Sequence, residues 1–315
     1  EICACLVGSE MCIRDRFLDM TKRRKIVWSL IAIAVLILLV VCAYMVSVPK
    51  LNIVYEVDEH TYYQSSRSIF RHEVQVNGYD QVSNVLLNDK ALYATAQKGG
   101  HRYFLFHDEA ADTTISVPDE DHAFSRIYAS FMYNGRYTVE YEYADGEEET
   151  KRMLVSIDFE NKERISIELP QQVLAGRIVS DGRRIFGSDK DYIYLLNEDK
   201  SVKRITRGSD VISVQDEVLY YVFNGKLCQY DLNAQTNSQA QNGPDLLEYD
   251  LIDPDSFYTV QNKYFVGCRL SVFAYSDSHS FLTYTTIYDL QHGKKYLFMG
   301  NLGRIAKNFQ ILNAD

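Results

Sequence analysis

Residues 124–159 read FSRIYASFMYNGRYTVEYEYADGEEETKRMLVSIDF, and this stretch predicts the fold class of the chain. Its first apolar run meets Asn134-Gly135, a pair that tolerates the positive φ angles of a two-residue hairpin turn. The return segment places Tyr or Val at every second position from Tyr137 to Tyr143, with Thr and Glu between them. This period of two is that of a half-buried strand.

A second turn, Asp145-Gly146, leads into a third segment in which Met153, Val155, Ile157 and Phe159 share one face. The stretch therefore predicts an antiparallel meander of three strands. A short helix over residues 124–131 is the alternative, because Phe124, Ile127, Tyr128 and Phe131 also fit helical spacing.

Working outward, a turn followed by a strand recurs along the chain, starting at Asn88, Asp181, Gln215 and Gln261. Each copy is followed by a strand that ends in an acidic or amide residue. Together with the strand ending at Asp158, these end points fall at residues 108, 158, 197, 231 and 289, at intervals of 50, 39, 34 and 58 residues. Repeats of about 40–50 residues built from four strands are typical of propeller blades.

This pattern resembles the membrane-anchored β-propeller-like domains of Gram-positive surface proteins, in which degenerate turn-and-strand units follow one N-terminal helix. The resemblance covers residues 81–290 and implies an all-β exterior of about six degenerate four-stranded units. Signatures of named propeller families are missing, since the single Trp is Trp28 and Gly99-Gly100 is the only Gly pair. The uneven intervals leave a pair of β-sandwiches or an irregular solenoid as alternatives.

An apolar run, residues 26–48, precedes the strands and contains no charged residue. As a helix it would be roughly 34 Å long, enough to cross a hydrocarbon core of about 30 Å. Lys22, Arg23, Arg24 and Lys25 lie directly before it and predict a cytoplasmic N-terminus. The sequence thus predicts a single-pass membrane protein that contacts lipid through residues 26–48. A cleaved signal peptide is the alternative, although its apolar stretch would be only about 7–15 residues long.

The expected organisation follows from these segments. Residues 1–19 look like translated sequencing-adapter read-through, or else a disordered tail, and residues 20–25 form a cytoplasmic stub. Residues 49–80 are expected to be a linker with the first strands, and residues 81–315 an extracellular propeller-like domain. A sensor function is disfavoured, because so short a cytoplasmic part leaves no room for a signalling domain.

Charge and cysteine content restrict the partners. The whole chain carries −10 and residues 1–49 contribute +2, so the exterior carries −12. Nucleic acids and other polyanions are disfavoured as partners, because binding them requires clustered cations. Only Cys228 and Cys268 lie in the exterior, and their places in successive units predict that they are not bridged.

Motifs that carry chemistry are absent from the sequence. The seven His residues show no metal-ligand spacing, so no metal site is expected. No nucleophile elbow and no Gly-rich phosphate loop occurs, so neither a catalytic residue nor a cofactor is expected. The sequence favours a noncatalytic binding or scaffolding domain for a protein, peptide or glycan.

Binding residues are predicted from apparent loop position and chemical type, because loops of a rigid scaffold often carry function. They are two aromatic residues early in the exterior and a polar group late in it: Tyr62, Tyr63, Tyr275, Asp277 and His279. The alternative function is a membrane-tethered hydrolase or lyase acting on a glycan or peptide, with carboxylates contributed by separate blades.

Overall fold

The computed structural model describes residues 2–88, 90–119, 126–145, 149–174, 176–197, 199–240, 243–246, 258–275, 278–298, 300 and 304–314. The chain divides into two compact units, residues 1–49 and residues 50–315, which are described separately.

The first unit is one helix, α1 (Ile2–Ser47). Its segment Lys25–Ser47 has a mean hydropathy of 3.1 and none of it is buried. It is long and apolar enough to cross a membrane, and a signal sequence meets the same criteria. Lys22, Arg23 and Arg24 lie in α1 directly before this segment, and the orientation they predict stays a prediction. The helix includes residues 2–19, whose origin also stays a prediction.

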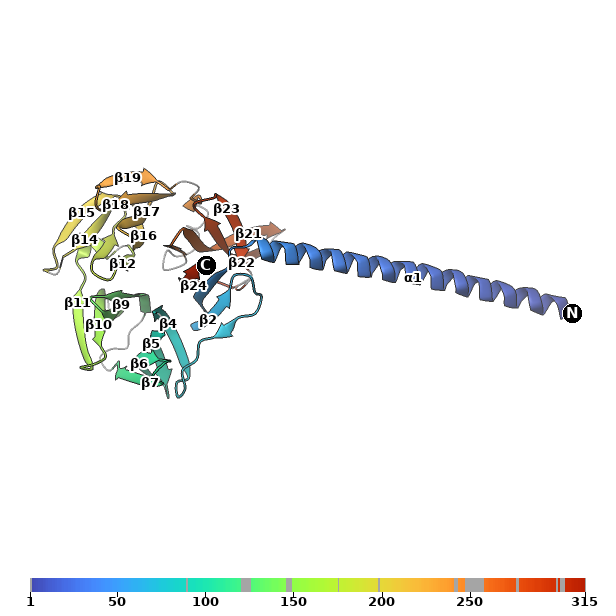
Figure 1. Cartoon of the computed structure of the whole chain (residues 1–315), viewed down its shortest axis with the longest axis horizontal. Coiled ribbons are helices and arrows are strands. Elements are labelled where there is room, and N and C mark those ends of the chain that lie inside the picture. The colour runs from blue at the N-terminus through green and yellow to red at the C-terminus, as the bar shows by residue number, and fades with distance from the viewer. Residues whose placement is uncertain are drawn as a thin grey trace. The chain divides into compact units, whose positions relative to one another are not determined.

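The second unit is a six-bladed β-propeller (Figure 1). Among its described residues, six four-stranded antiparallel sheets follow one another around a ring, and we number these blades from 1 to 6. From the centre outward, blade 1 is β24 (Lys307–Ala314), β1 (Leu51–Val57), β2 (His60–Ser65) and β3 (His72–Glu73). Blade 2 is β4 (Gln81–Asn88), β5 (Ala91–Lys98), β6 (His101–Asp108) and β7 (Thr113–Pro118). Blade 3 is β8 (Arg126–Tyr133), β9 (Arg136–Asp145), β10 (Glu149–Asp158) and β11 (Glu163–Glu168).

Blades 4 to 6 complete the ring. Blade 4 follows the short 3-10 helix η1 (Gln171–Val173) and is β12 (Ile178–Ser180), β13 (Ile185–Ser188), β14 (Tyr192–Leu196) and β15 (Val202–Arg207). Blade 5 is β16 (Asp210–Gln215), β17 (Val218–Phe223), β18 (Lys226–Asp231) and β19 (Thr236–Gln239). Blade 6 is β20 (Tyr258–Gln261), β21 (Tyr264–Tyr275), β22 (Ser278–Asp289) and β23 (Lys294–Phe298).

Closure of the ring depends on the last strand. β24 pairs antiparallel with β1, so the C-terminal strand completes the blade that the start of the unit begins. Residues 51–73, expected to be a linker with first strands, therefore form three of the four strands of blade 1. The meander over residues 126–158 is confirmed, and the alternative helix is wrong, because residues 126–133 form strand β8. Sandwich and solenoid arrangements are likewise excluded by the closed ring.

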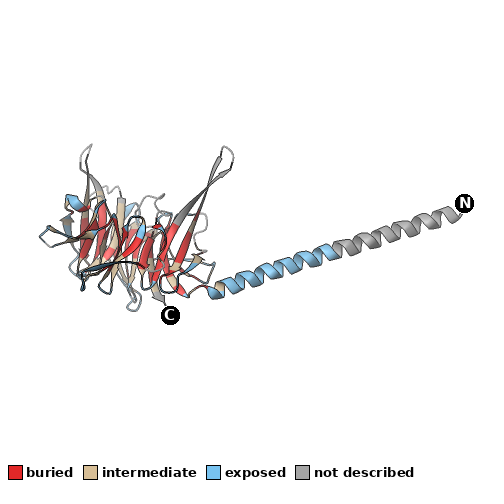
Figure 2. Ribbon diagram, turned by 90° about the horizontal axis from the view of Figure 1, so that it is seen from above, coloured by how far each residue is buried: buried red, intermediate tan, exposed pale blue. Residues whose placement is uncertain are grey.

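The core consists of six apolar clusters, one between each pair of neighbouring blades. Figure 2 shows buried residues along the strands of the propeller. The second strand of blades 1, 4 and 5 is mostly buried, because each blade packs against two others. The abundant Tyr residues serve this packing, and many keep a polar contact at the edge of a cluster. The Tyr137 hydroxyl, for example, donates to the Asn84 carbonyl at 2.7 Å. Cys228 and Cys268 are buried in two different clusters and are not joined by a disulfide.

The acidic residues that end the repeated strands cap the turns to the outermost strands. Asp231 Oδ1 accepts hydrogen bonds from the backbone N–H groups of Asn233 and Ala234, at 2.9 and 2.8 Å. Asp108, Asp158 and Asp289 make the same pair of contacts two and three residues ahead. The repeated acidic position is therefore explained by turn formation.

Three glutamines join neighbouring innermost strands. Gln310 donates to the Leu87 carbonyl at 2.6 Å and accepts from the Leu87 N–H at 2.9 Å. Gln215 makes the same two contacts with Asn262, and Gln261 accepts from the Ile311 N–H. These side chains connect blades 5 and 6, 6 and 1, and 1 and 2 in sequence.

Candidate binding face

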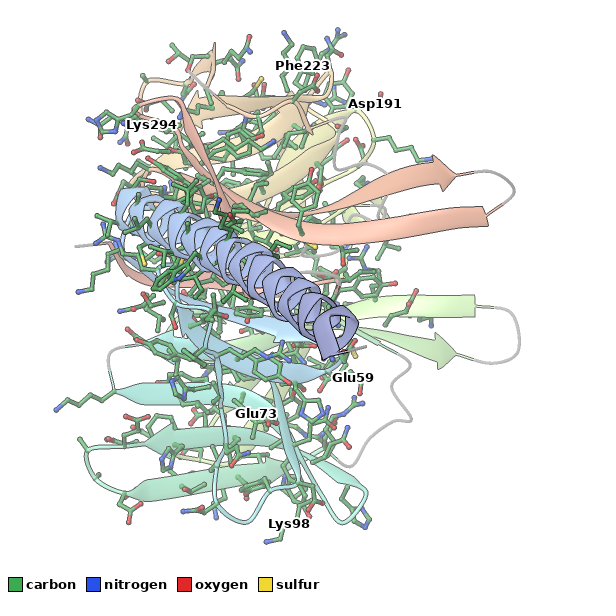
Figure 3. The ribbon with its side chains drawn as sticks, turned by 90° about the vertical axis from the view of Figure 1, so that its right-hand side faces the viewer. Glu59, Glu73, Lys98, Asp191, Phe223 and Lys294 are labelled. Atoms are coloured by element: carbon green, nitrogen blue, oxygen red, sulfur yellow. The ribbon has the colours of Figure 1, made fainter. Side chains whose placement is uncertain are left out.

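One face of the propeller carries all six turns between the second and third strands of the blades, and we call it the hairpin face. Two of its hairpins are longer than the others: β9–β10, with strands of 10 residues, and β21–β22, with strands of 12 residues. They belong to blades 3 and 6, which lie opposite each other in the ring. Figure 3 shows both hairpins projecting on the same side of the propeller.

The outer part of β21–β22 extends beyond its own sheet. β20 pairs with β21 only over Tyr264–Gly267, and β23 pairs with β22 only over Thr285–Asp289. Among the described residues, the two strands farther out pair only with each other, up to the Tyr275–Ser278 pair. No other described strand pairs with their outer backbone edges there. Such edges can pair with an added strand, and an isolated two-stranded ribbon has little stability of its own.

The predicted binding residues fall in two places. Tyr275 ends β21 and His279 lies near the start of β22, so both stand at the end of this projecting hairpin. Asp277 lies outside the described residues. These placements leave the binding role as a prediction.

Tyr62 and Tyr63 do not lie in a loop, because both belong to strand β2. Alternation along the strand sends them to opposite faces of blade 1. Tyr62 packs on the cluster with blade 6, beneath the Arg71 guanidinium at 4.0 Å, and Tyr63 packs on the cluster with blade 2. The predicted loop position of Tyr62 and Tyr63 is wrong, because blade packing places both residues in a strand between two apolar clusters.

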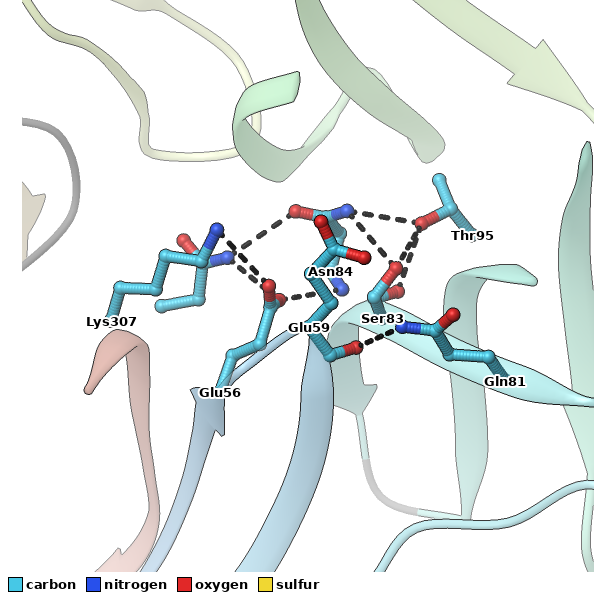
Figure 4. A network of polar contacts seen from close by, with 8 residues as sticks. Glu56, Glu59, Gln81, Ser83, Asn84, Thr95 and Lys307 are labelled. Atoms are coloured by element: carbon cyan, nitrogen blue, oxygen red, sulfur yellow. Dashed lines mark hydrogen bonds and ion pairs between the residues drawn. The ribbon is translucent and has the colours of Figure 1, made fainter. Parts of the chain in front are cut away.

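A polar pocket of about 170 Å³ opens at the hairpin face where blades 1 and 2 meet, and Figure 4 shows its hydrogen bonds. At its base the Glu56 side chain is only 3% exposed. Its Oε1 lies 3.2 Å from Lys307 Nζ, and its Oε2 accepts from Asn84 N–H at 3.1 Å and from Asn308 Nδ2 at 3.0 Å. Three donors thus contact this buried carboxylate. A charge that is removed from water needs such partners, because burying it unpaired is costly.

Asn84 and Asn308 occupy equivalent bulges in neighbouring innermost strands. Their φ angles are +50° and +53°, a backbone conformation that Asn tolerates better than most residues. At each bulge two residues of the inner strand face one residue of its partner. The Asn84 amide nitrogen also donates to Thr95 Oγ1 at 3.0 Å, so the pocket wall is fixed by hydrogen bonds.

The side chains of the pocket can both donate and accept hydrogen bonds. Around Glu56 the lining contains two cations, a second carboxylate and two side-chain amides, which both donate and accept hydrogen bonds. These groups belong to Arg102, Lys307, Glu59, Gln81 and Gln97. No His or Cys lies in this lining. Ser83, its one serine, is hydrogen-bonded to Thr95 at 3.0 Å. The arrangement suits a neutral polar group such as a sugar hydroxyl or a peptide amide.

A second polar group lies at the hairpin-face end of the central channel. Asp210 begins β16, and its Oδ2 accepts from the Tyr258 hydroxyl at 2.9 Å. Its Oδ1 accepts from Arg177 N–H and Ser188 Oγ–H, both at 3.3 Å. Burial raises the pKa of Asp210 above its ordinary value, against the opposing effect of the nearby Arg177 charge. These contacts connect blades 4, 5 and 6.

Sequence reasoning missed both polar groups, because their members lie far apart in the chain. One signal was present: Asn84 and Asn308, of a residue type that tolerates positive φ, each lie within a strand, in SNV and KNF. A polar residue at such a position can mark a bulge. No sequence pattern indicates that Glu56 faces both.

Comparisons with known proteins address the fold. No protein-family model matches the chain, and the search of curated proteins found no match. Among solved structures, a chain of a nidogen/laminin complex has a TM-score of 0.51 at 9% identity, with 84% of this chain and 99% of that chain covered. TolB from Acinetobacter baumannii has a TM-score of 0.49 at 10% identity, with 83% of this chain and 66% of that chain covered.

A putative 6-phosphogluconolactonase from Bacteroides uniformis has a TM-score of 0.46 at 10% identity, with 84% of this chain and 100% of that chain covered. Identities this low concern the fold alone. The strand topology, with the likeness to the chain of the nidogen/laminin complex, defines the chain as a six-bladed β-propeller preceded by one N-terminal apolar helix.

Proposed function

We propose that this chain is a single-pass membrane protein whose extracellular propeller binds a protein, peptide or glycan through its hairpin face without catalysing a reaction. The observation that carries the proposal is the projection of the two longest hairpins, from opposite blades, on the face that holds the Glu56 pocket (Figure 3). A ligand seated between the hairpins would meet the pocket and the channel mouth together.

Three features support this function. The unpaired edges of β21–β22 offer backbone hydrogen bonds to an extended partner segment. The pocket offers side-chain donors and acceptors to a polar partner. The −12 charge of the exterior disfavours polyanionic partners. A bacterial surface location of the Gram-positive type, with residues 26–48 as the anchor, belongs to the same proposal.

The location is tested by treating intact cells with protease. We expect loss of the exterior and retention of a membrane fragment near residues 20–50. Release of the exterior into the medium without protease would instead show a cleaved signal peptide.

Binding is tested by cross-linking the full chain to its neighbours in native membranes. A shortened variant replaces residues 271–282 with Asn-Gly between the paired residues Leu270 and Thr283. We expect it to lose captured partners while its urea midpoint stays close to wild type. The control substitutes Ala for Lys294 and Lys295. These residues begin β23, next to the β22–β23 turn, on the face opposite the hairpin face. Equal capture by both variants would contradict the proposal.

Individual side chains are tested separately from the hairpin backbone. Replacing Tyr275, Asp277 and His279 together with Ala should weaken capture, whereas replacing Tyr62 and Tyr63 should lower stability, because those two pack between blades. Turnover of a glycan or peptide by the purified chain, abolished by Glu56→Gln or Glu59→Gln, would favour the hydrolase or lyase alternative.

A further inference from the structure

A cavity of about 220 Å³ lies in the central channel, lined by the innermost strands of all six blades. Its volume far exceeds the ~10–15 Å³ that holds one water, and it is below the ~300–1,000 Å³ of pockets for drug-sized ligands. The cavity therefore has room for a molecule of only a few non-hydrogen atoms, or for the end of a chain.

The charge of the lining is one-sided. Among the lining residues Arg177 is the only charged one, and no Asp or Glu is among them. The Arg177 guanidinium donates through Nη2 to the Tyr258 carbonyl at 3.1 Å and lies 4.9 Å from the centre of the Tyr258 ring. Asp210 accepts from the backbone N–H of Arg177. Within the described part of the chain, no carboxylate is within ion-pair distance of the guanidinium.

Two buried polar atoms of the lining residues have no hydrogen-bond partner among the described residues. They are Nη1 of Arg177, on blade 4, and Oγ of Ser213, on the neighbouring blade 5. Buried donors normally have a hydrogen-bond partner. A buried donor without one destabilises the protein by about the free energy needed to remove that group from water. Both atoms can donate, so together they match an acceptor that carries negative charge. A carboxylate is that acceptor, because its planar pair of oxygens suits a guanidinium.

The rest of the lining is mixed. Polar residues such as Ser130 and Thr259 lie beside apolar ones such as Ile212 and Val260. The glutamines of the lining are already bonded to backbone groups. The cavity thus combines one cationic group with a lining of both polar and apolar residues.

We infer that the central channel binds the carboxylate of a small molecule or chain end, held by the Arg177 guanidinium and the Ser213 hydroxyl. The carboxylate belongs either to a small free acid or to the C-terminus of a peptide. This inference is independent of the proposed function, since it concerns the channel interior and not the projecting hairpins.

Binding is tested with the full chain in lipid nanodiscs by titration calorimetry. The probes are butyrate against butyramide, which is neutral and of similar shape, and a tripeptide ending Gly-Ala-Val with a free against an amidated C-terminus. We expect at least tenfold weaker binding of each neutral form. Preference for butyrate identifies a free acid, and preference for the free-ended tripeptide identifies a chain end. Equal binding of charged and neutral forms, or binding of none, would overturn the inference.

Two variants and a control assign the site. Arg177→Gln should weaken carboxylate binding at least tenfold, and Ser213→Ala a few-fold. The control Arg183→Gln makes the same change in charge at an exposed turn residue and should leave binding unchanged. If Arg177→Gln proves unstable, Ser213→Ala decides alone: unaltered affinity in that variant would refute the role of its hydroxyl. Affinity lost equally in Arg183→Gln would show a general charge effect and refute the site.

Discussion

Replacing Glu56 by Ala should destabilise the propeller more than any exposed carboxylate substitution. The change removes the acceptor of the Asn84 N–H and of the Asn308 amide, and the partner of Lys307. The buried Asn84 N–H left unpaired costs about 1–3 kcal/mol. The lost Cγ methylene group adds about 0.8 kcal/mol. Lys307 adds less than about 1 kcal/mol, because its side chain is 36% exposed and can return to water.

We therefore expect a loss of about 3–5 kcal/mol in the free energy of unfolding for Glu56→Ala, the range typical of breaking a buried ion pair. Glu56→Gln keeps the shape and one acceptor, so it should lose about 1–2 kcal/mol. Glu59→Gln is the matched control, because this residue lines the same pocket but is exposed, and it should change stability by less than about 0.5 kcal/mol.

The assay is urea denaturation of the full chain in detergent micelles, followed by near-ultraviolet circular dichroism of tyrosine. Tryptophan fluorescence does not serve, because the single Trp28 lies in α1. A double-mutant cycle with Lys307→Met isolates the ion pair from the two amide contacts. Glu56→Ala within 1 kcal/mol of wild type would refute the reasoning.

The remaining predictions use the same denaturation assay. Gln310→Ala should lower the free energy of unfolding by about 2–3 kcal/mol, because the backbone N–H and C=O of Leu87 both lose a part-buried partner. Gln215→Ala should lower it by less than about 1 kcal/mol, because its two contacts are exposed. Equal losses would contradict this order. Asp231→Ala should lose about 1 kcal/mol and Asp231→Asn less, since Asn keeps an acceptor for the turn. Because burial raises the folded-state pKa of Asp210, the folded state binds this proton more tightly than the unfolded state. Stability should therefore fall as pH rises from about 4 through the folded pKa, and Asp210→Asn should flatten that part of a pH series; an unchanged slope would contradict it.

Strand positions were predictable because they depend on neighbours in the chain. The period-two alternation of residues 137–143 and the Asn134-Gly135 turn correspond to β9 and to the β8–β9 turn. Residues 81–289 hold all strands from β4 to β22, and among the described residues there no helix exceeds the three-residue η1. The repeated acidic strand ends were also visible, because the backbone N–H groups that they bind in the turn lie two or three residues ahead. The apolar segment of α1 follows from hydropathy alone.

Ring closure and both polar groups were decided only by tertiary structure. The pairing of β24 with β1 joins residues about 250 positions apart, and no local pattern records such a pairing. Tyr62 and Tyr63 look like a polar aromatic loop in sequence, but blade packing places them in a strand between two cores. Glu56 reads as one more charge in a strand until the bulges at Asn84 and Asn308 point donors at it. The sequence specifies which residues of a strand alternate between its two faces. Which strand faces pack against each other is decided only when the ring of blades closes and buries them.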